Sequence, residues 1–151
     1  MAEFTRHFAD ADELLGAAWD DLNAELLTDL AEAFATAGEG LVDRARAVIT
    51  TFVRSTERDP VKAAVALGDY SANAVLDHRR QSAILHLASL FATAFKTTNL
   101  RDIHIQMTTV HLVGGVFELM RFWRSGALDV TTDQIIEHAA HMVTSVTEQY
   151  V

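Results

Sequence analysis

Apolar residues recur at intervals of three and four along most of this chain, and that spacing places them on one face of an α-helix. The alternation of apolar and polar residues that is typical of a half-buried strand is nearly absent. The pattern therefore predicts an all-α protein, a bundle of about six helices. The expected helices cover residues 11–36, a second segment that ends at "ERDP", a short or kinked third that starts at Pro60, residues 75–97, residues 102–124, and a last segment from Thr131 to the chain end.

Residues with strong positional preferences mark several of the expected helix ends. Helix starts are indicated by Asp10 with Glu13, Asp59 with Pro60, and Thr131 with Gln134. In the first and third pairs the first residue accepts hydrogen bonds from the free amides of the helix start, and the second residue reaches back to the amide of the first. In the second pair Pro60 suits the first helical position because it has no amide that needs a partner. Gly68 and Gly126 supply stops. The chain has no internal repeat and no low-complexity linker, so we expect one domain.

The last two expected helices carry more apolar surface than one chain needs. Residues 102–124 are apolar nearly all round, and the final helix has two neighbouring apolar stripes. Since a surface helix needs only one apolar face, burial from two sides is indicated, either by a second copy or in a monomeric core. The mid-helix glycines at 114 and 115 each cost about 1 kcal/mol relative to alanine, which the close approach of another helix would explain. We expect a homodimer whose interface includes Gly114, Gly115, Ile135, Ala139, Met142 and Val146.

The stretch "FTRHFADADELL", residues 4–15, resembles the junction in TetR-family transcriptional repressors at which the recognition helix of a helix-turn-helix ends and the next helix begins. The matching residues are Phe4, His7, Phe8 and Leu14. A turn of the type W-x-x-G-x-L-D before the last helix, here "WRSGALD" at residues 123–129, extends the resemblance. The resemblance implies that residues 11–151 form a ligand-binding and dimerisation domain, whose last two helices build a four-helix bundle with a second copy. Residues 1–10 would be the remnant of the recognition helix.

The resemblance also implies an N-terminal DNA-binding head, of which this chain would carry only the end. Thr5 and Ala11 stand where the family has Tyr and Lys residues that help to hold DNA phosphates. The net charge of −9 also disfavours DNA binding by this chain alone, because basic faces supply most of the nonspecific affinity for DNA. We therefore expect DNA to be a partner only if an N-terminal head is present.

Composition indicates a compartment and excludes several kinds of site. The chain has no cysteine, so it has no disulfide framework and no thiolate metal ligand. The first residues lack the pattern of a secretory signal, and the most apolar windows are too short and too polar to cross a bilayer. We expect a cytoplasmic protein without a membrane partner.

A small-molecule pocket is expected among the middle helices, both from the resemblance and from the bulky residues on their inward stripes. A mostly apolar cavity with a few polar groups would accept a small hydrophobic or amphipathic effector. The alternative is that the aromatic residues simply fill the core. The candidate ligand-binding residues are Trp19, Phe52, His86, Phe91, Phe95, Met107 and His111.

Residue patterns that carry chemistry are sparse. His138 and His141 are spaced i, i+3 beside Glu137, but there is no H-E-x-x-H pattern, and surface or interface histidines explain this spacing better than a metal site. No serine lies in a nucleophile elbow, and no glycine-rich phosphate loop is present. We expect neither an enzyme nor a metal or other cofactor.

Three functions fit these patterns. The leading one is a TetR-like regulator, in which an effector would shift the helices and change the spacing of two DNA-reading heads that must match half-sites about 34–36 Å apart. The second is a headless subunit that heterodimerises with a full-length regulator and modulates it. The third is a carrier of small apolar molecules.

Overall fold

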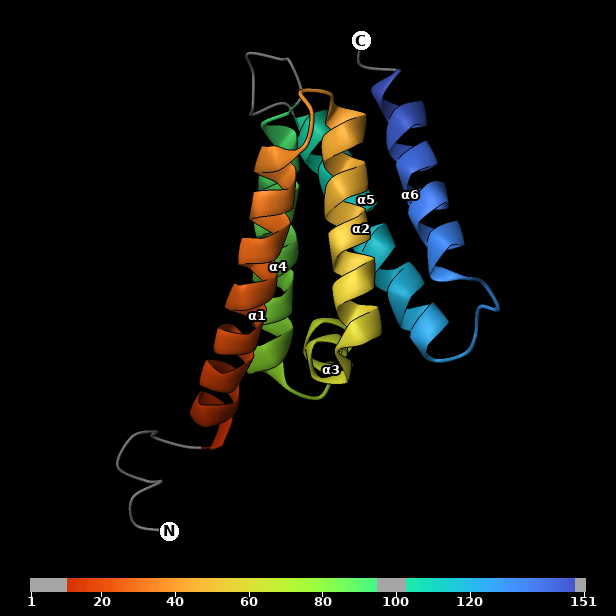
Figure 1. Cartoon of the computed structure of the whole chain (residues 1–151). Coiled ribbons are helices and arrows are strands. Elements are labelled where there is room, and N and C mark those ends of the chain that lie inside the picture. The colour runs from red at the N-terminus through yellow and green to blue at the C-terminus, as the bar shows by residue number, and fades with distance from the viewer. Residues whose placement is uncertain (1–10, 95–102, 149–151) are drawn as a thin grey trace.

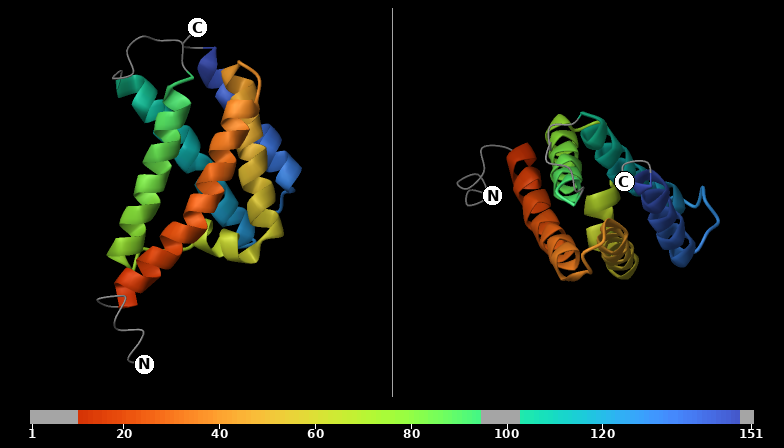
Figure 2. Two further views of the ribbon diagram at one scale, coloured as in Figure 1. Left: turned by 60° about the vertical axis from the view of Figure 1, so that its left-hand side comes forward. Right: turned by 90° about the horizontal axis from the view of Figure 1, so that it is seen from above.

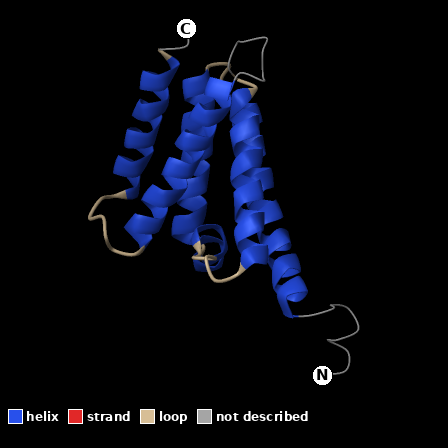
Figure 3. Ribbon diagram, turned by 180° about the vertical axis from the view of Figure 1, so that it is seen from behind, coloured by secondary structure: helices blue, strands red, loops and turns tan. Residues whose placement is uncertain are grey.

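The computed structural model describes residues 11–94 and 103–148, and within these ranges the chain is helical and has no strand (Figures 1 and 3). The predicted all-α class and the six helices are confirmed. The helices are α1 (Ala11–Thr36), α2 (Leu41–Arg58), α3 (Pro60–Leu67), α4 (Ala74–Ala92), α5 (Ile103–Arg124) and α6 (Thr132–Thr147).

Side chains at the helix starts explain why three of the helices begin where they do. Asp59 accepts hydrogen bonds from two amides of α3, at 2.9 and 3.1 Å, and Pro60 occupies the first turn. Thr131 and Gln134 form the predicted capping box of α6, with hydrogen bonds of 2.8 and 3.2 Å. Asn73 caps α4 in the same way as Asp59 caps α3, which the sequence pattern did not reveal.

The helix ends agree with the sequence pattern except at α4. Gly126, in the turn after α5, has a φ of 78°, which is the left-handed conformation that glycine adopts readily. The helix predicted to continue to residue 97 instead ends at Ala92, where the amides of Thr93 and Ala94 donate to carbonyls three residues back, at 3.3 and 3.0 Å, and the turn tightens. The predicted cap at Asp10 and the last residues of the chain lie outside the described residues.

The helices form a bundle that α5 crosses obliquely. α1 and α4 run side by side on one flank, α2 lies between them and α6, and α3 closes one end (Figures 1 and 2). α6 packs mainly along α2, and α5 packs mainly along α4. Because α5 and α6 follow different neighbours, they diverge from each other.

The main core draws side chains from all six helices. Two aromatic pairs lie in it or against it: the ring centroids of Phe52 and Phe117 are 4.7 Å apart, and those of Phe34 and Phe91 are 5.5 Å apart in an edge-to-face contact. Each such pair contributes about 0.5–1.5 kcal/mol beyond the burial of its area. Trp19 belongs to a separate, smaller cluster between α1 and α4.

The final helix has one wide apolar face. Ile135, Ile136, Ala139, Ala140 and Val143 are all buried. At 100° per residue they span an arc of about 140°, which α2 and the main core cover within the same chain. These five residues are therefore covered without a second copy, whereas Met142, on the same stripe as Ile135 and Ala139, is 41% exposed.

The fifth helix keeps an apolar side in solvent. Ile103 and Met107 are 58% and 54% exposed, Val110 is 37% exposed, and Gly114 continues the same i, i+4, i+7, i+11 row. We call these four residues the α5 outer stripe. Met107 was expected on an inward stripe, but the row that contains Ile105 turns inward instead.

Candidate functional site

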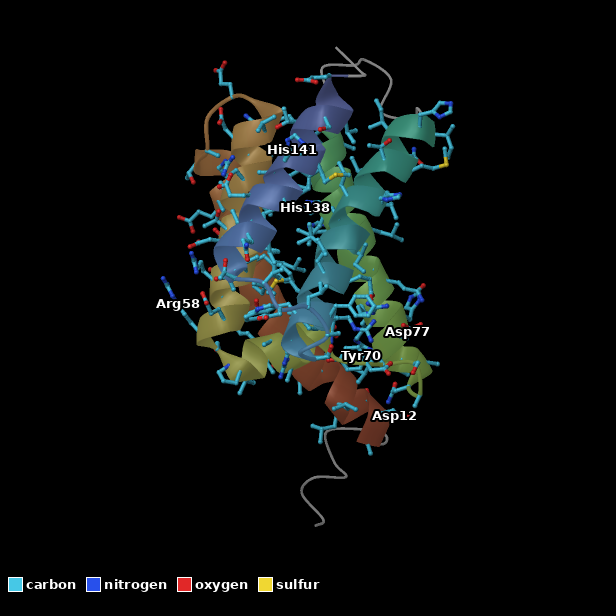
Figure 4. All side chains as sticks on the ribbon, turned by 90° about the vertical axis from the view of Figure 1, so that its right-hand side faces the viewer. Asp12, Arg58, Tyr70, Asp77, His138 and His141 are labelled. Atoms are coloured by element: carbon cyan, nitrogen blue, oxygen red, sulfur yellow. The ribbon has the colours of Figure 1, made fainter. Side chains whose placement is uncertain are left out.

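A cavity of about 260 Å³ lies inside the bundle, between α2, α5 and α6, with smaller contributions from α1 and α4. The lining residues that are exposed to solvent all belong to α5 and α6: His111, Gly115, His138 and Met142. The cavity therefore opens between these two helices, on the face of the molecule that Figure 4 turns toward the viewer. It exists because α5 and α6 diverge.

The wall of the cavity is almost wholly apolar. The apolar side chains in it come from Leu30, Leu41, Ala45, Val48, Ile49, Phe52, Leu87, Phe91, Leu112, Val113, Val116, Phe117, Leu119, Ala139, Met142 and Val143. Among the described residues, the polar side chains in the wall are those of Thr109, His111 and His138. Such a wall suits an apolar ligand, since filling it removes apolar surface from water.

The polar side chains of the wall are not evenly placed. Thr109 is buried, and its hydroxyl lies 2.9 Å from the Ile105 carbonyl and 3.0 Å from that of Gln106, so its hydrogen is used inside α5. His111 and His138 are exposed and stand on different helices at the opening. The interior is therefore apolar and the mouth is polar.

Part of the predicted ligand-binding set lines this cavity. Phe52 reaches it from α2, Phe91 from α4 and His111 from α5. The two phenylalanines also contact Phe117 and Phe34 respectively, so they join the cavity wall to the packed core.

The structure places the rest of that set elsewhere. Trp19 packs in its own cluster between α1 and α4, His86 is exposed on α4, and Met107 belongs to the α5 outer stripe. Phe95 lies outside the described residues. The size of a side chain on an inward stripe therefore did not show whether that side chain would line the cavity or pack in the core.

Most of the cavity wall consists of aliphatic residues that the sequence analysis did not single out. Val48, Ile49, Val116 and Val143 are among them, and their types are those of any helical core. His138 was considered as a metal ligand and as a surface or interface histidine, and the structure places it at the mouth of the cavity. The sequence feature that could have placed His138 there is its position next to Ala139, which lies on an apolar stripe of α6.

The residues predicted for a dimer interface fall into three groups. A Cβ atom added to Gly114 or Gly115 would meet nothing within 4 Å, so no part of the described chain approaches these glycines closely. Ile135 and Ala139 are each only 3% exposed, because α2 and the main core cover them. Met142 is exposed and Val146 is half-buried, so neither is fully used within the chain.

A polar network fixes the start of α6 against α2, and with it one wall of the cavity. Arg54 donates to Glu57 at 2.8 Å and to Thr132 at 2.9 Å, and it pairs with Asp133. The Thr132 hydroxyl lies 3.1 Å from Glu57. The hydrogen bond from Arg54 holds the pKa of Glu57 below its ordinary value of 4.5, and the same bond raises the pKa of Arg54.

The remaining candidate sites add no further chemistry. His138 and His141 are exposed, and no group of three His, Cys, Asp or Glu side chains within residues 11–94 and 103–148 is arranged to hold a metal ion. Of the helix-turn-helix motif, Leu14 is half-buried on α1, and Phe4, His7 and Phe8 lie outside the described residues.

Comparisons of this chain with protein-family models, with curated proteins and with solved structures found no match. None of the described helices has both the length and the apolar character needed to cross a membrane.

Proposed function

We propose that this protein is a ligand-binding and dimerising domain of the TetR-like regulator type, and that it binds a small hydrophobic or amphipathic effector. The observation that carries the proposal is the apolar cavity of about 260 Å³ between α2, α5 and α6. Protein interiors are close-packed, with few voids larger than a water molecule. A cavity of this volume is therefore a departure from ordinary packing, and a ligand that fills it gains free energy by removing the apolar wall from water.

The position of the cavity supports a regulatory use of that ligand. α5 and α6 form its mouth, so a bound molecule would act on the angle between them. The α5 outer stripe, with three exposed apolar side chains and a glycine, supports self-association on the same helix. Ligand binding and the arrangement of two copies would then be coupled through α5.

The α5 outer stripe equally favours a second candidate function, an interaction subunit that pairs with a related full-length regulator. In that case this chain would occupy one side of a heterodimer and weaken the partner's binding to DNA. A carrier of apolar molecules, the third function expected from sequence, would need the cavity but not the stripe.

Analytical ultracentrifugation of two matched variants tests the proposal. Met107→Glu places a charge on the α5 outer stripe, and Leu85→Glu places one on a residue of α4 that is exposed to the same degree. We expect the wild-type chain and Leu85→Glu to be dimers and Met107→Glu to be a monomer. A monomeric wild-type chain would contradict the homodimer; if it then joined a full-length regulator and abolished a gel shift, it would be the interaction subunit.

A further inference from the structure

The size of the cavity limits the part of a ligand that can be buried in it. A water molecule occupies about 30 Å³ in the liquid, so 260 Å³ accommodates roughly nine groups of that size. Because the wall is apolar except at the mouth, these groups must be hydrocarbon. A chain of about eight carbons, or an aromatic ring with a short substituent, fits this requirement.

The polar groups at the mouth fix which end of the ligand faces outward. His111 on α5 and His138 on α6 are the exposed polar side chains of the wall. The Thr109 hydroxyl, deep in the wall, uses its hydrogen within α5 and offers an inward ligand no donor. A ligand with one polar end would therefore place that end at the mouth, where these two side chains stand (Figure 4 labels His138).

The chemistry of the mouth distinguishes between kinds of head group. An imidazole ring carries at least one N–H donor in either protonation state. Within the described chain no carboxylate lines the cavity, and the acidic residues nearest in sequence are held elsewhere: Glu118 by Arg121 at 3.0 Å, and Glu137 by Arg46. At the mouth an ammonium head would find, among the described residues, no carboxylate to pair with, whereas a carboxylate would accept charge-assisted hydrogen bonds from the imidazole N–H groups.

We infer that the cavity binds a medium-chain monocarboxylate, with its hydrocarbon chain between α2 and α5 and its carboxylate held by His111 and His138. This inference rests on the proposed function, because it requires that the cavity binds a ligand at all. It adds the class of the ligand and the two residues that select it.

Isothermal titration calorimetry of the full chain tests this inference with three probes of equal chain length: octanoate, octan-1-ol and octylammonium. We expect octanoate to bind most tightly and octylammonium least. In the double variant His111→Leu/His138→Leu, octanoate should bind about tenfold more weakly, which corresponds to the loss of a charge-assisted hydrogen bond, while octan-1-ol should bind as before. His141→Leu, one turn further along α6 and outside the cavity wall, is the matched control and should change neither affinity.

The outcomes separate the two levels of the proposal. If octan-1-ol binds and the double variant leaves octanoate affinity unchanged, or if octylammonium binds most tightly, the ligand class is wrong and the ligand-binding function stands. If none of the three probes binds the wild-type chain, the cavity is not a ligand site and both proposals fall. Since both histidines are exposed, the double variant should keep the helical circular dichroism of the wild type.

Discussion

Single residues determine how closely the backbone can approach its surroundings, and the glycines of this chain differ sharply in that respect. A Cβ on Gly68 would lie 2.7 Å from the carbonyl oxygen of Ala64 and 2.7 Å from the ring of Tyr70. The Tyr70 hydroxyl donates to the Val65 carbonyl at 2.6 Å, so the ring cannot move away without losing that bond. Gly114, in contrast, faces open space.

Two alanine substitutions should therefore change stability in opposite directions. We expect Gly68→Ala to lower the free energy of unfolding by about 1–3 kcal/mol, because a backbone carbonyl must move. We expect Gly114→Ala to raise the intrinsic stability of α5 by about 1 kcal/mol and to weaken the proposed dimer, since the added Cβ would separate two copies. Urea denaturation, together with ultracentrifugation, measures both quantities. A stable Gly68→Ala protein would contradict the packing around Tyr70.

At the scale of helices, the sequence pattern predicted which segments form helices better than it predicted which neighbour each helix has. Helix starts depend on local side chains such as Asp59 and Thr131, and these predictions were confirmed. The burial of α6 depends instead on α2, far away in the chain. The sequence showed two neighbouring apolar stripes on α6 but not that α2 would cover Ile135, Ile136 and Ala139 and leave Met142 exposed.

For the candidate site as well, the sequence indicated residue types but not which distant segments each residue would meet. Phe52, Phe91 and His111 were predicted from their bulk or polarity, and they do line the cavity. Trp19 has equal bulk but lies beside α4, where the neighbours fill the space. A cavity forms where segments far apart in the sequence leave space unfilled. The valines and the isoleucine of its wall could therefore not be distinguished in the sequence from valines and isoleucines of the packed core.

The attachment of α6 to α2 should weaken when the polar network at its start is broken. We expect Arg54→Ala to increase hydrogen exchange of α6 amides more than of α4 amides, because Arg54 contacts Glu57, Thr132 and Asp133. Arg58→Ala, at an exposed neighbouring position (Figure 4), is the control and should have a smaller effect. Equal exchange in the two variants would show that the network does not hold α6.

The same network gives the stability a defined dependence on pH. The pKa of Glu57 is lowered from 4.5 in the folded chain, chiefly by the hydrogen bond from Arg54. The ionised Glu57 side chain therefore adds to the free energy of unfolding above pH 4.5, and this contribution is lost as the pH falls through the lowered pKa of the folded chain. The stability difference between wild type and Glu57→Gln should therefore be largest above pH 4.5 and vanish in stronger acid. A difference that grows in acid would contradict this sign.

At the scale of the whole molecule, the path of α5 connects the cavity to the apolar surface. One side of this helix lines the cavity through Val113 and Phe117, and another side carries the α5 outer stripe. A ligand that moves α5 would therefore also move the surface at which a second copy is proposed to bind. The coupling of ligand binding to self-association through α5 depends first on the cavity being a ligand site.

Methyl NMR spectra recorded during a titration with octan-1-ol would detect both a filled cavity and a movement of α5. They should be compared between the wild-type chain and Val113→Phe, whose larger side chain would occupy the cavity. We expect the methyl signals of Val48, Ile49 and Val143 in the cavity wall to shift, together with that of Ile103 on the α5 outer stripe, and those of Val61 and Leu85, exposed on α3 and α4, to stay in place. In Val113→Phe the wall signals should no longer respond. Shifts confined to exposed methyl groups, or an undiminished response in Val113→Phe, would contradict a ligand site inside the bundle.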